Sequence, residues 1–329
     1  MEIYGTLGPA CMNAECLYKM IQNGMTGIRV NLSHAMLADM KEGLENLHRA
    51  ERMLIKDIDI MADIEGPELR ILAFEGKILL NEGYKVKFTS ELCESYTNEI
   101  PVPAELLPYI DEETNILLDD GKMELLREGD YFKVVRGGVL LSKKSIKLVN
   151  VEVKKETLTV NDLKNISAFK AHNVTKVMLP FVRDAEDVKT LRNALDTADC
   201  KDVKIYAKIE NETGLENLDA IMQEADVIVI ARGDLGNAYG LIELPIVQDK
   251  ISEKCRKAGK EFLVVTQMLD SMLDKKIPTR AETSDIFRAV RDGATALMLT
   301  NETSVGKYPI ESMKMMCDVA MAAEKYCRS

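Results

Sequence analysis

The sequence predicts an α/β protein: a (β/α)8 barrel with a small all-β domain inserted after its third strand. Two observations support this fold. Eight short β-branched or apolar runs recur along the 329 residues, with helical patterns between most of them. The segment between the third and fourth runs instead reads as short strands joined by tight turns. Eight strand–helix units are the number that closes a barrel of this type.

The barrel strands are predicted from short apolar runs, which are typical of strands buried on both faces. They cover residues 3–7, 28–32, 59–63, 175–179, 203–209, 227–230, 262–266 and 296–299. Helices are predicted over residues 13–23, 185–194, 215–224, 246–258, 281–292 and 309–326. Three of them stop at Gly24, Gly259 and Gly293, because glycine readily takes the left-handed conformation that ends a helix.

The inserted domain is predicted over residues 67–152, which leaves 1–66 and 153–329 for the barrel. Residues 79–83, 84–88 and 134–140 read as strands with tight turns, and Arg136-Gly137-Gly138 reads as a hairpin connection. An insertion after strand 3 lies on the carboxyl-terminal face of a barrel, where active sites form. We therefore expect a lid, with inert decoration as the alternative.

Composition narrows the possible functions. The net charge is −11 and the lysines are dispersed, which argues against nucleic-acid binding. The seven cysteines form no CxxC pair, so neither a disulfide framework nor a zinc site is indicated. No signal peptide and no apolar run of membrane-spanning length is evident, so a cytoplasmic protein is expected.

Charged residues end two neighbouring strands. Strict alternation in 203–210 places Lys208 and Glu210 on the same face, and Asp234 follows the next strand. Charge at the end of a buried strand is costly unless it is paired or binds something. A lysine between two carboxylates suggests a divalent metal and an anionic substrate, although a salt bridge at the barrel rim would produce the same pattern.

Other strand ends carry polar residues as well. Arg29, Asn31 and Ser33 alternate on one face of strand 2, Asp63 ends strand 3, and Thr266 ends strand 7. The helix that starts at Thr279-Arg280 has free N–H groups that suit an anion. Each signal is weak alone, but together they bring cations, carboxylates and a hydroxyl to one end of one barrel, as a catalytic site would.

These motifs resemble the pyruvate kinase family, in order along the whole chain. The matching segments are Thr6-Leu7-Gly8-Pro9-Ala10, Arg29-Val30-Asn31-Leu32-Ser33-His34, Gly66-Pro67-Glu68-Leu69-Arg70, Asp119-Asp120-Gly121, Lys208-Ile209-Glu210-Asn211, Ala231-Arg232-Gly233-Asp234-Leu235-Gly236, Thr266-Gln267-Met268-Leu269, Pro278-Thr279-Arg280-Ala281-Glu282 and Asn301-Glu302-Thr303. The resemblance implies transfer of a phosphoryl group from phosphoenolpyruvate to ADP, giving pyruvate and ATP.

The resemblance also implies residue roles. Glu210 and Asp234 would hold Mg2+ or Mn2+, and Lys208 would stabilise the transferring phosphoryl group and the enolate. Arg29 would bind the substrate phosphate and the nucleotide, and the Gly233 and Asp234 N–H groups would bind the substrate carboxylate. Thr266 would lie near the carbon that is protonated, with Glu302 in the proton path.

Two further sets of residues are implied. The K+ ligands would be Asn31, Ser33, Asp63 and the Ile64 carbonyl, and the nucleotide phosphates would be contacted by Arg70 and Lys144.

Several features depart from the family pattern. The chain ends after the eighth barrel helix, so we expect no C-terminal regulatory domain and no allostery through one. The departures near the site are Ala35, Glu65, Pro180, Asn237-Ala238-Tyr239-Gly240 and Thr300-Asn301, which leave nucleotide preference and turnover rate open. Glu68 is the residue that accompanies potassium dependence in the family, so K+ activation is expected.

Two alternative functions stay open. One is a metal-dependent lyase or aldolase acting on 2-oxo acids, which would need neither a nucleotide lid nor a potassium site. The other is a non-catalytic or divergent member that binds phosphoenolpyruvate-like metabolites. The oligomeric state is open too, with a homo-oligomer through barrel contacts as one option.

Overall fold

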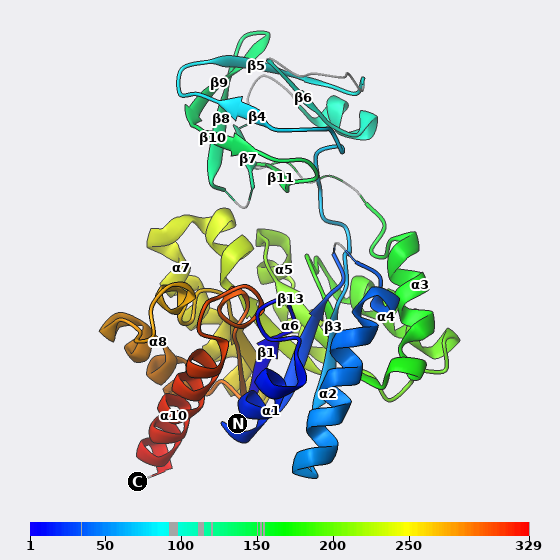
Figure 1. Cartoon of the computed structure of the whole chain (residues 1–329). Coiled ribbons are helices and arrows are strands. Elements are labelled where there is room, and N and C mark those ends of the chain that lie inside the picture. Colours follow the sequence, from blue (N-terminus) through cyan, green and yellow to red (C-terminus); the bar gives the residue numbers. More distant parts are fainter. Residues whose placement is uncertain are drawn as a thin grey trace. The chain divides into compact units, whose positions relative to one another are not determined.

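Eight parallel strands close into a barrel, in the order β1-β16-β15-β14-β13-β12-β3-β2 (Figure 1). The computed structural model describes residues 1–33, 35–91, 98–110, 115–119, 121–149, 151, 153 and 155–328. They form two units, Met1–Gly66 with Thr157–Ser329, and Pro67–Glu156. The first unit holds the closed barrel, which confirms the predicted (β/α)8 fold.

Each predicted barrel strand is present within two residues of its expected bounds. The barrel strands are β1 (Glu2–Thr6), β2 (Gly27–Asn31), β3 (Asp59–Asp63), β12 (Val174–Leu179), β13 (Lys204–Ile209), β14 (Val227–Ala231), β15 (Phe262–Val265) and β16 (Ala296–Met298). The helices around them are α1 (Ala14–Gln22), η1 (Leu37–Met40), α2 (Lys41–Leu54), α3 (Val160–Ala168), η3 (Lys170–His172), α4 (Ala185–Thr197), α5 (Glu212–Glu216), α6 (Leu218–Glu224), α7 (Arg232–Ala258), η4 (Asp270–Leu273), α8 (Arg280–Arg291), α9 (Asn301–Ser304) and α10 (Pro309–Arg328).

The alternation in β13 sorts its side chains between two cores. Ile205, Ala207 and Ile209 pack in the layer between strands and helices. Tyr206 lies in a second cluster with other inward residues of the strands, such as Met61 and Val229. Lys208 and Glu210 follow Tyr206 on the same face, so the period of two carries them to the carboxyl end of the barrel interior, as predicted.

Helix α7 begins earlier than the predicted helix over 246–258. It starts at Arg232, directly after β14, and is interrupted at Gly240, which has φ 76° and ψ 160°. The break places Pro245 near the start of the second segment, where a missing N–H costs little. The sequence pattern showed only this second segment, because the first is short and contains glycines that weaken a helical signal.

The inserted unit is built from short β-strands, as the sequence predicted. Its six-stranded sheet has the order β11-β7-β8-β9-β5-β6, and β10 pairs with β4 in a separate two-stranded sheet. The bounds are β4 (Ile78–Leu80), β5 (Lys85–Thr89), β6 (Glu99–Pro101), η2 (Ala104–Tyr109), β7 (Asn115–Leu118), β8 (Met123–Glu128), β9 (Tyr131–Arg136), β10 (Gly138–Leu140) and β11 (Ile146–Leu148). Its own apolar core includes Leu80, Leu125 and Phe132.

The hairpin predicted at Arg136-Gly137-Gly138 is wrong. Strand β9 pairs with β8 and β5, whereas β10 pairs with β4, so Gly137 carries the chain from one sheet to the other. A Cβ atom on Gly137 would lie 2.3 Å from the Leu80 carbonyl oxygen. Glycine is needed here for close approach of two backbones, and sequence alone does not distinguish this from a turn.

A polar network closes the amino-terminal end of the barrel. Lys176 is 4% exposed, and its Nζ lies 2.8 Å from both Glu2 Oε1 and Asp59 Oδ2 and also contacts the Tyr4 hydroxyl. The Tyr4 and Tyr206 hydroxyls donate to Glu2 Oε2 at 2.6 and 3.2 Å. A buried charge is stable only when it is paired and hydrogen-bonded, as it is here. We therefore assign this network to the stability of the fold, since active sites of such barrels form at the opposite, carboxyl-terminal end.

We expect this network to stabilise the fold most at neutral pH. Burial opposes ionisation of Glu2, but hydrogen bonds from Lys176 and Tyr4 outweigh it and lower the pKa of Glu2. Burial likewise opposes the Lys176 charge, but Asp59 and Glu2 raise the pKa of Lys176 to about 12. The first contribution is lost as pH falls through the lowered carboxyl pKa, and the second as pH rises from the ordinary lysine value toward 12.

The measurement is melting temperature against pH for the wild type and Lys176→Met. The variant should lose several degrees at pH 7 and less at pH 3, because the contribution of Glu2 weakens as the pH falls toward its lowered pKa. An equal loss at both pH values would show that Lys176 acts through packing alone.

Candidate active site

The charged residues predicted from sequence meet at the carboxyl end of the barrel. Lys208 Nζ lies 3.0 Å from Glu210 Oε1 and 3.7 Å from Asp63 Oδ1. The Lys208 and Glu210 side chains are only 15% and 1% exposed. The backbone N–H of Phe181, directly beyond β12, donates to Glu210 Oε2 at 2.8 Å. The lysine and its carboxylates are thus a buried group, not a solvated rim pair.

Arg29 joins this group through Asp63. Its Nη2 and Nε both lie close to Asp63 Oδ2, at 2.7 and 2.8 Å, and its Nη1 donates to Thr6 Oγ1 at 3.4 Å. Strands β2 and β3 are neighbours in register, with Asn31 opposite Asp63. Asp63 therefore fixes the direction of the guanidinium and stands between the two cations Arg29 and Lys208.

The electrostatics of the group favour an added cation. Burial raises the pKa of Glu210 to about 7; Lys208 opposes the rise, and Asp234 adds to it. For Lys208, burial disfavours the charge, but Asp63 and Glu210 outweigh burial and raise its pKa. Two carboxylates that repel each other at a buried site are stabilised when positive charge lies between them.

The donor set fits an ion of the Mg2+ type that takes its other ligands from water and substrate. Within the described ranges no group of three or more His, Cys, Asp or Glu side chains is arranged to hold a metal. Glu210 and the half-buried Asp234, in the first turn of α7, offer two carboxylates. Mg2+ is commonly bound through one or two carboxylates plus water and substrate phosphate oxygens, so two protein ligands are sufficient.

The predicted potassium ligands lie at the ends of β2 and β3. Asp63 Oδ1 is buried and accepts no hydrogen bond in the described part of the chain. Asn31 Oδ1 accepts from the Ser33 N–H at 3.1 Å, which folds the strand end into a turn. The Ile64 N–H donates to the Met178 carbonyl at 3.4 Å. A buried carboxylate oxygen that accepts no hydrogen bond, on a residue opposite Asn31 in register, is a group that a bound monovalent cation would satisfy.

Thr266 lies in a strained turn after β15. Its φ is 80° and that of Gln267 is 54°, so two consecutive non-glycine residues are left-handed. For a β-branched residue this conformation is rare, and each such residue costs about 1–3 kcal/mol. Backbone strain of this kind persists only where neighbours enforce it.

Glu302 and Glu282 accept hydrogen bonds from the backbone of loops at the carboxyl end of the barrel. Glu302 is 2% exposed and accepts the N–H groups of Leu269 and Thr300, at 3.0 and 2.9 Å. It thereby joins the loops after β15 and β16. Glu282 accepts the N–H groups of Thr279 and Ser271, so the start of α8, predicted to suit an external anion, is capped by an internal carboxylate.

Two of the three predicted nucleotide residues, Arg70 and Lys144, are neighbours within the inserted unit. Arg70 pairs with Glu68 at 2.5 Å, and its Nη1 donates to the Lys143 carbonyl at 2.9 Å. Lys144 Nζ lies 2.8 Å from Asp119 Oδ1. Each of the two cations is thus paired with a carboxylate of this unit. Of the quoted motif residues, His34 and Asp120 lie outside the described residues.

Three groups that hold the site residues or the neighbouring loops in place were not predicted from the sequence. Arg232 was quoted in a motif but was given no role, the Phe181 N–H carries no side-chain signal, and Asp162 lies in a helix that was not predicted. Asp162 starts α3 in a Thr-x-x-Asp pattern with Thr159 and accepts the Glu65 and Gly66 N–H groups. The capping pattern could have revealed this helix.

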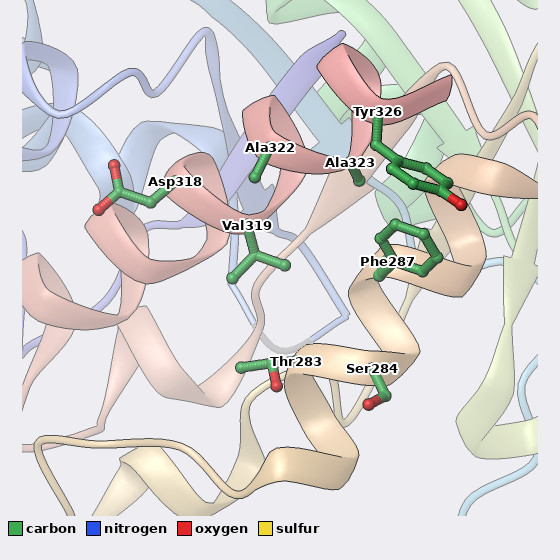
Figure 2. A pocket seen from close by; sticks show the side chains of 8 residues that line it. All are labelled: Thr283, Ser284, Phe287, Asp318, Val319, Ala322, Ala323 and Tyr326. Carbon is green, nitrogen blue, oxygen red and sulfur yellow. The ribbon is translucent and has the colours of Figure 1, made fainter. Parts of the chain in front are cut away.

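A cavity of about 470 Å3 lies between helices α8 and α10 on the outer layer (Figure 2). Phe287 and Tyr326 contact each other with ring centroids 5.5 Å apart. Its one charged lining residue, Asp318, pairs with Lys314 at 2.5 Å. Its other polar lining residues carry hydroxyl groups: Thr283, Ser284 and Tyr326. Among the described residues, no helix combines the length and apolar character needed to cross a membrane.

Comparison with known proteins agrees with this arrangement. The family model for the pyruvate kinase barrel domain matches residues 1–313. The chain is 35% identical to a pyruvate kinase of Thermococcus litoralis over 335 residues, covering 100% of this chain and 70% of that protein. Identity is 35% with the Aeropyrum pernix pyruvate kinase, covering 99% of this chain and 71% of that one, and 34% with the Geobacillus stearothermophilus pyruvate kinase, covering 98% and 57%. The chain belongs to the pyruvate kinase family.

Proposed function

We propose that this chain transfers a phosphoryl group from phosphoenolpyruvate to ADP, giving pyruvate and ATP. The observation that carries the proposal is the buried group of Arg29, Asp63, Lys208 and Glu210 at the carboxyl end of a barrel of this family. Phosphoryl transfer needs positioning and charge neutralisation more than covalent chemistry, and a lysine and an arginine fixed by carboxylates supply both.

Each residue has a role in this proposal. Lys208 would stabilise negative charge on the transferring group and the enolate, and Arg29, aimed by Asp63, would bind the substrate phosphate. The N–H groups of Gly233 and Asp234 would bind the substrate carboxylate, and Thr266 would lie near the carbon that is protonated. We place Glu302 second to Thr266 in the proton path, because both loops around it depend on its hydrogen bonds.

Glu210 and Asp234 would hold Mg2+ or Mn2+, which when bound neutralises phosphate and carboxylate charge. Asn31, Ser33, Asp63 and the Ile64 carbonyl would hold K+. We further propose that the inserted unit acts as a lid that supplies Arg70 and Lys144 to nucleotide phosphates. A cytoplasmic location is proposed from the glycolytic chemistry and the cysteine pattern.

The direct test measures pyruvate formation from phosphoenolpyruvate and ADP with Mg2+, with oxaloacetate turnover without nucleotide as a parallel assay. Formation of pyruvate only with ADP and Mg2+ supports the proposal. Turnover of oxaloacetate alone would favour a lyase, and tight phosphoenolpyruvate binding without turnover would favour a non-catalytic member.

Potassium should accelerate the reaction. The Asp63 Oδ1 atom has no hydrogen bond, and a cation beside it would complete the charge balance around the substrate phosphate. We expect replacement of K+ by tetramethylammonium at equal ionic strength to lower kcat about tenfold, equal to about 1.4 kcal/mol of barrier. Equal rates in both salts would remove the potassium site from the proposal.

A further inference from the structure

The turn that contains Thr266 is held by hydrogen bonds from one arginine, Arg232. The Arg232 guanidinium donates to the Thr266 carbonyl from Nη2 at 2.7 Å and from Nε at 3.1 Å. Nη2 also reaches the Gln267 carbonyl at 3.2 Å. These are the carbonyls of the two consecutive residues of this turn that have left-handed backbones. A planar fork of donors can hold two carbonyls in one fixed geometry, which an ammonium cannot.

Arg232 is itself held in place. Its Nη1 lies 2.5 Å from Asp285 Oδ2, on α8, and its side chain is only 10% exposed. Because Arg232 starts α7 directly after β14, the arginine joins three consecutive parts of the barrel: the end of β14, the turn after β15, and α8. Arg232 therefore links these three segments at the carboxyl end of the barrel, where Lys208 and Glu210 also lie.

The next residue, Gly233, leaves room for the Thr266 side chain. A Cβ atom on Gly233 would lie 3.3 Å from Thr266 Cγ2 and 3.9 Å from its Oγ1. Gly233 therefore lets the threonine side chain approach the backbone at the start of α7. Arg232 holds the main chain of Thr266, while Gly233 shapes the space for its side chain.

We propose that Arg232 is a positioning residue that sets the Thr266 hydroxyl for the proton-transfer half of the reaction, with Asp285 orienting Arg232. The proposal rests on the proposed function and extends it. Relaxation of a left-handed threonine would rotate its side chain away from its place, and misplacement of a reacting group by about 1 Å can cost about 100-fold in rate.

The structure allows a sharp test by chemical rescue. A cavity of about 230 Å3 lies beside the turn, lined among others by Arg232, Asp285, Gln267 and Arg288. Arg232→Ala should enlarge this cavity enough for free guanidinium at millimolar concentration. Arg288→Ala is the matched control, because Arg288 lines the same cavity but pairs with Asp249 and Asp292.

Three quantities would be measured: kcat for pyruvate formation, KM for phosphoenolpyruvate, and exchange of pyruvate methyl protons with D2O. For Arg232→Ala we expect kcat and proton exchange to fall together by about 100-fold, with KM changed less than threefold. Guanidinium chloride should restore at least tenfold of both in assays that already hold saturating K+, and tetramethylammonium chloride at equal concentration should restore neither. Arg288→Ala should behave as wild type.

Several outcomes would overturn the inference. These are an Arg232→Ala enzyme as active as Arg288→Ala, unchanged proton exchange with slow phosphoryl transfer, or no rescue by guanidinium in a folded variant. If Arg232→Ala does not fold, Arg232→Lys decides, because wild-type kcat in that variant would contradict the need for a fork. A wild-type protein that forms no pyruvate would refute the proposed function itself, which is a separate result.

Discussion

Lys208→Met is expected to lower kcat for pyruvate formation by about 1,000-fold, or ~4 kcal/mol of transition-state stabilisation. The Lys208 ammonium is buried between Asp63 and Glu210, so its charge acts at low dielectric where the transferring phosphoryl group would lie. Methionine has a similar length and leaves packing intact while removing the charge.

The fold should survive this substitution. Without Lys208, Glu210 can take up a proton, since burial already raises its pKa to about 7. Lys204→Met, on the exposed start of the same strand, is the matched control and should retain wild-type kcat. Steady-state kinetics with thermal melting of all three proteins make the measurement. Wild-type activity in Lys208→Met would refute the assigned mechanism.

Asp162→Ala is expected to lower the free energy of unfolding by about 3 kcal/mol, because it leaves several donors unpaired. Asp162 is fully buried. Its carboxylate accepts the Glu65, Gly66 and Thr159 N–H groups at 2.8, 3.0 and 2.8 Å.

The matched control is Asp184→Ala. Asp184 caps α4 by accepting the Glu186 and Asp187 N–H groups at 2.9 and 3.1 Å, but at an exposed position. Loss of an exposed cap should cost about 1 kcal/mol. Denaturant unfolding followed by far-UV circular dichroism compares the two variants. Equal costs for both would show that burial adds nothing at Asp162.

The barrel could be predicted because the spacing of apolar residues along the chain indicates its strands and most of its helices. The run 203–210 alternates strictly, and this pattern placed Lys208 and Glu210 on one face of the strand, which the structure shows to be the inner face of the barrel. The order of motifs then indicated which strand ends meet. Local pattern and tertiary packing agree in these strands, so local reasoning was enough.

What could not be predicted depends on approaches between distant backbones. Gly137 is required by the Leu80 carbonyl, and Glu210 depends on the Phe181 N–H. The left-handed Thr266 is held by Arg232, which is 34 residues away in the chain. No sequence window contains both partners of these contacts, and glycine or threonine alone suggests a turn or an ordinary strand end.

The carboxylate of Asp162 also bears on how a chain accommodates an insertion. By binding the N–H groups of Gly66 and Thr159, it holds together, within the barrel unit, the points where the chain leaves and returns. The ends of the intervening segment are brought together by the barrel, whatever that segment contains. Since closing a flexible loop twice as long costs only about 0.6 kcal/mol more, the length of the insertion can change with little effect on barrel stability. The barrel and its inserted unit are in this sense free to evolve at different rates.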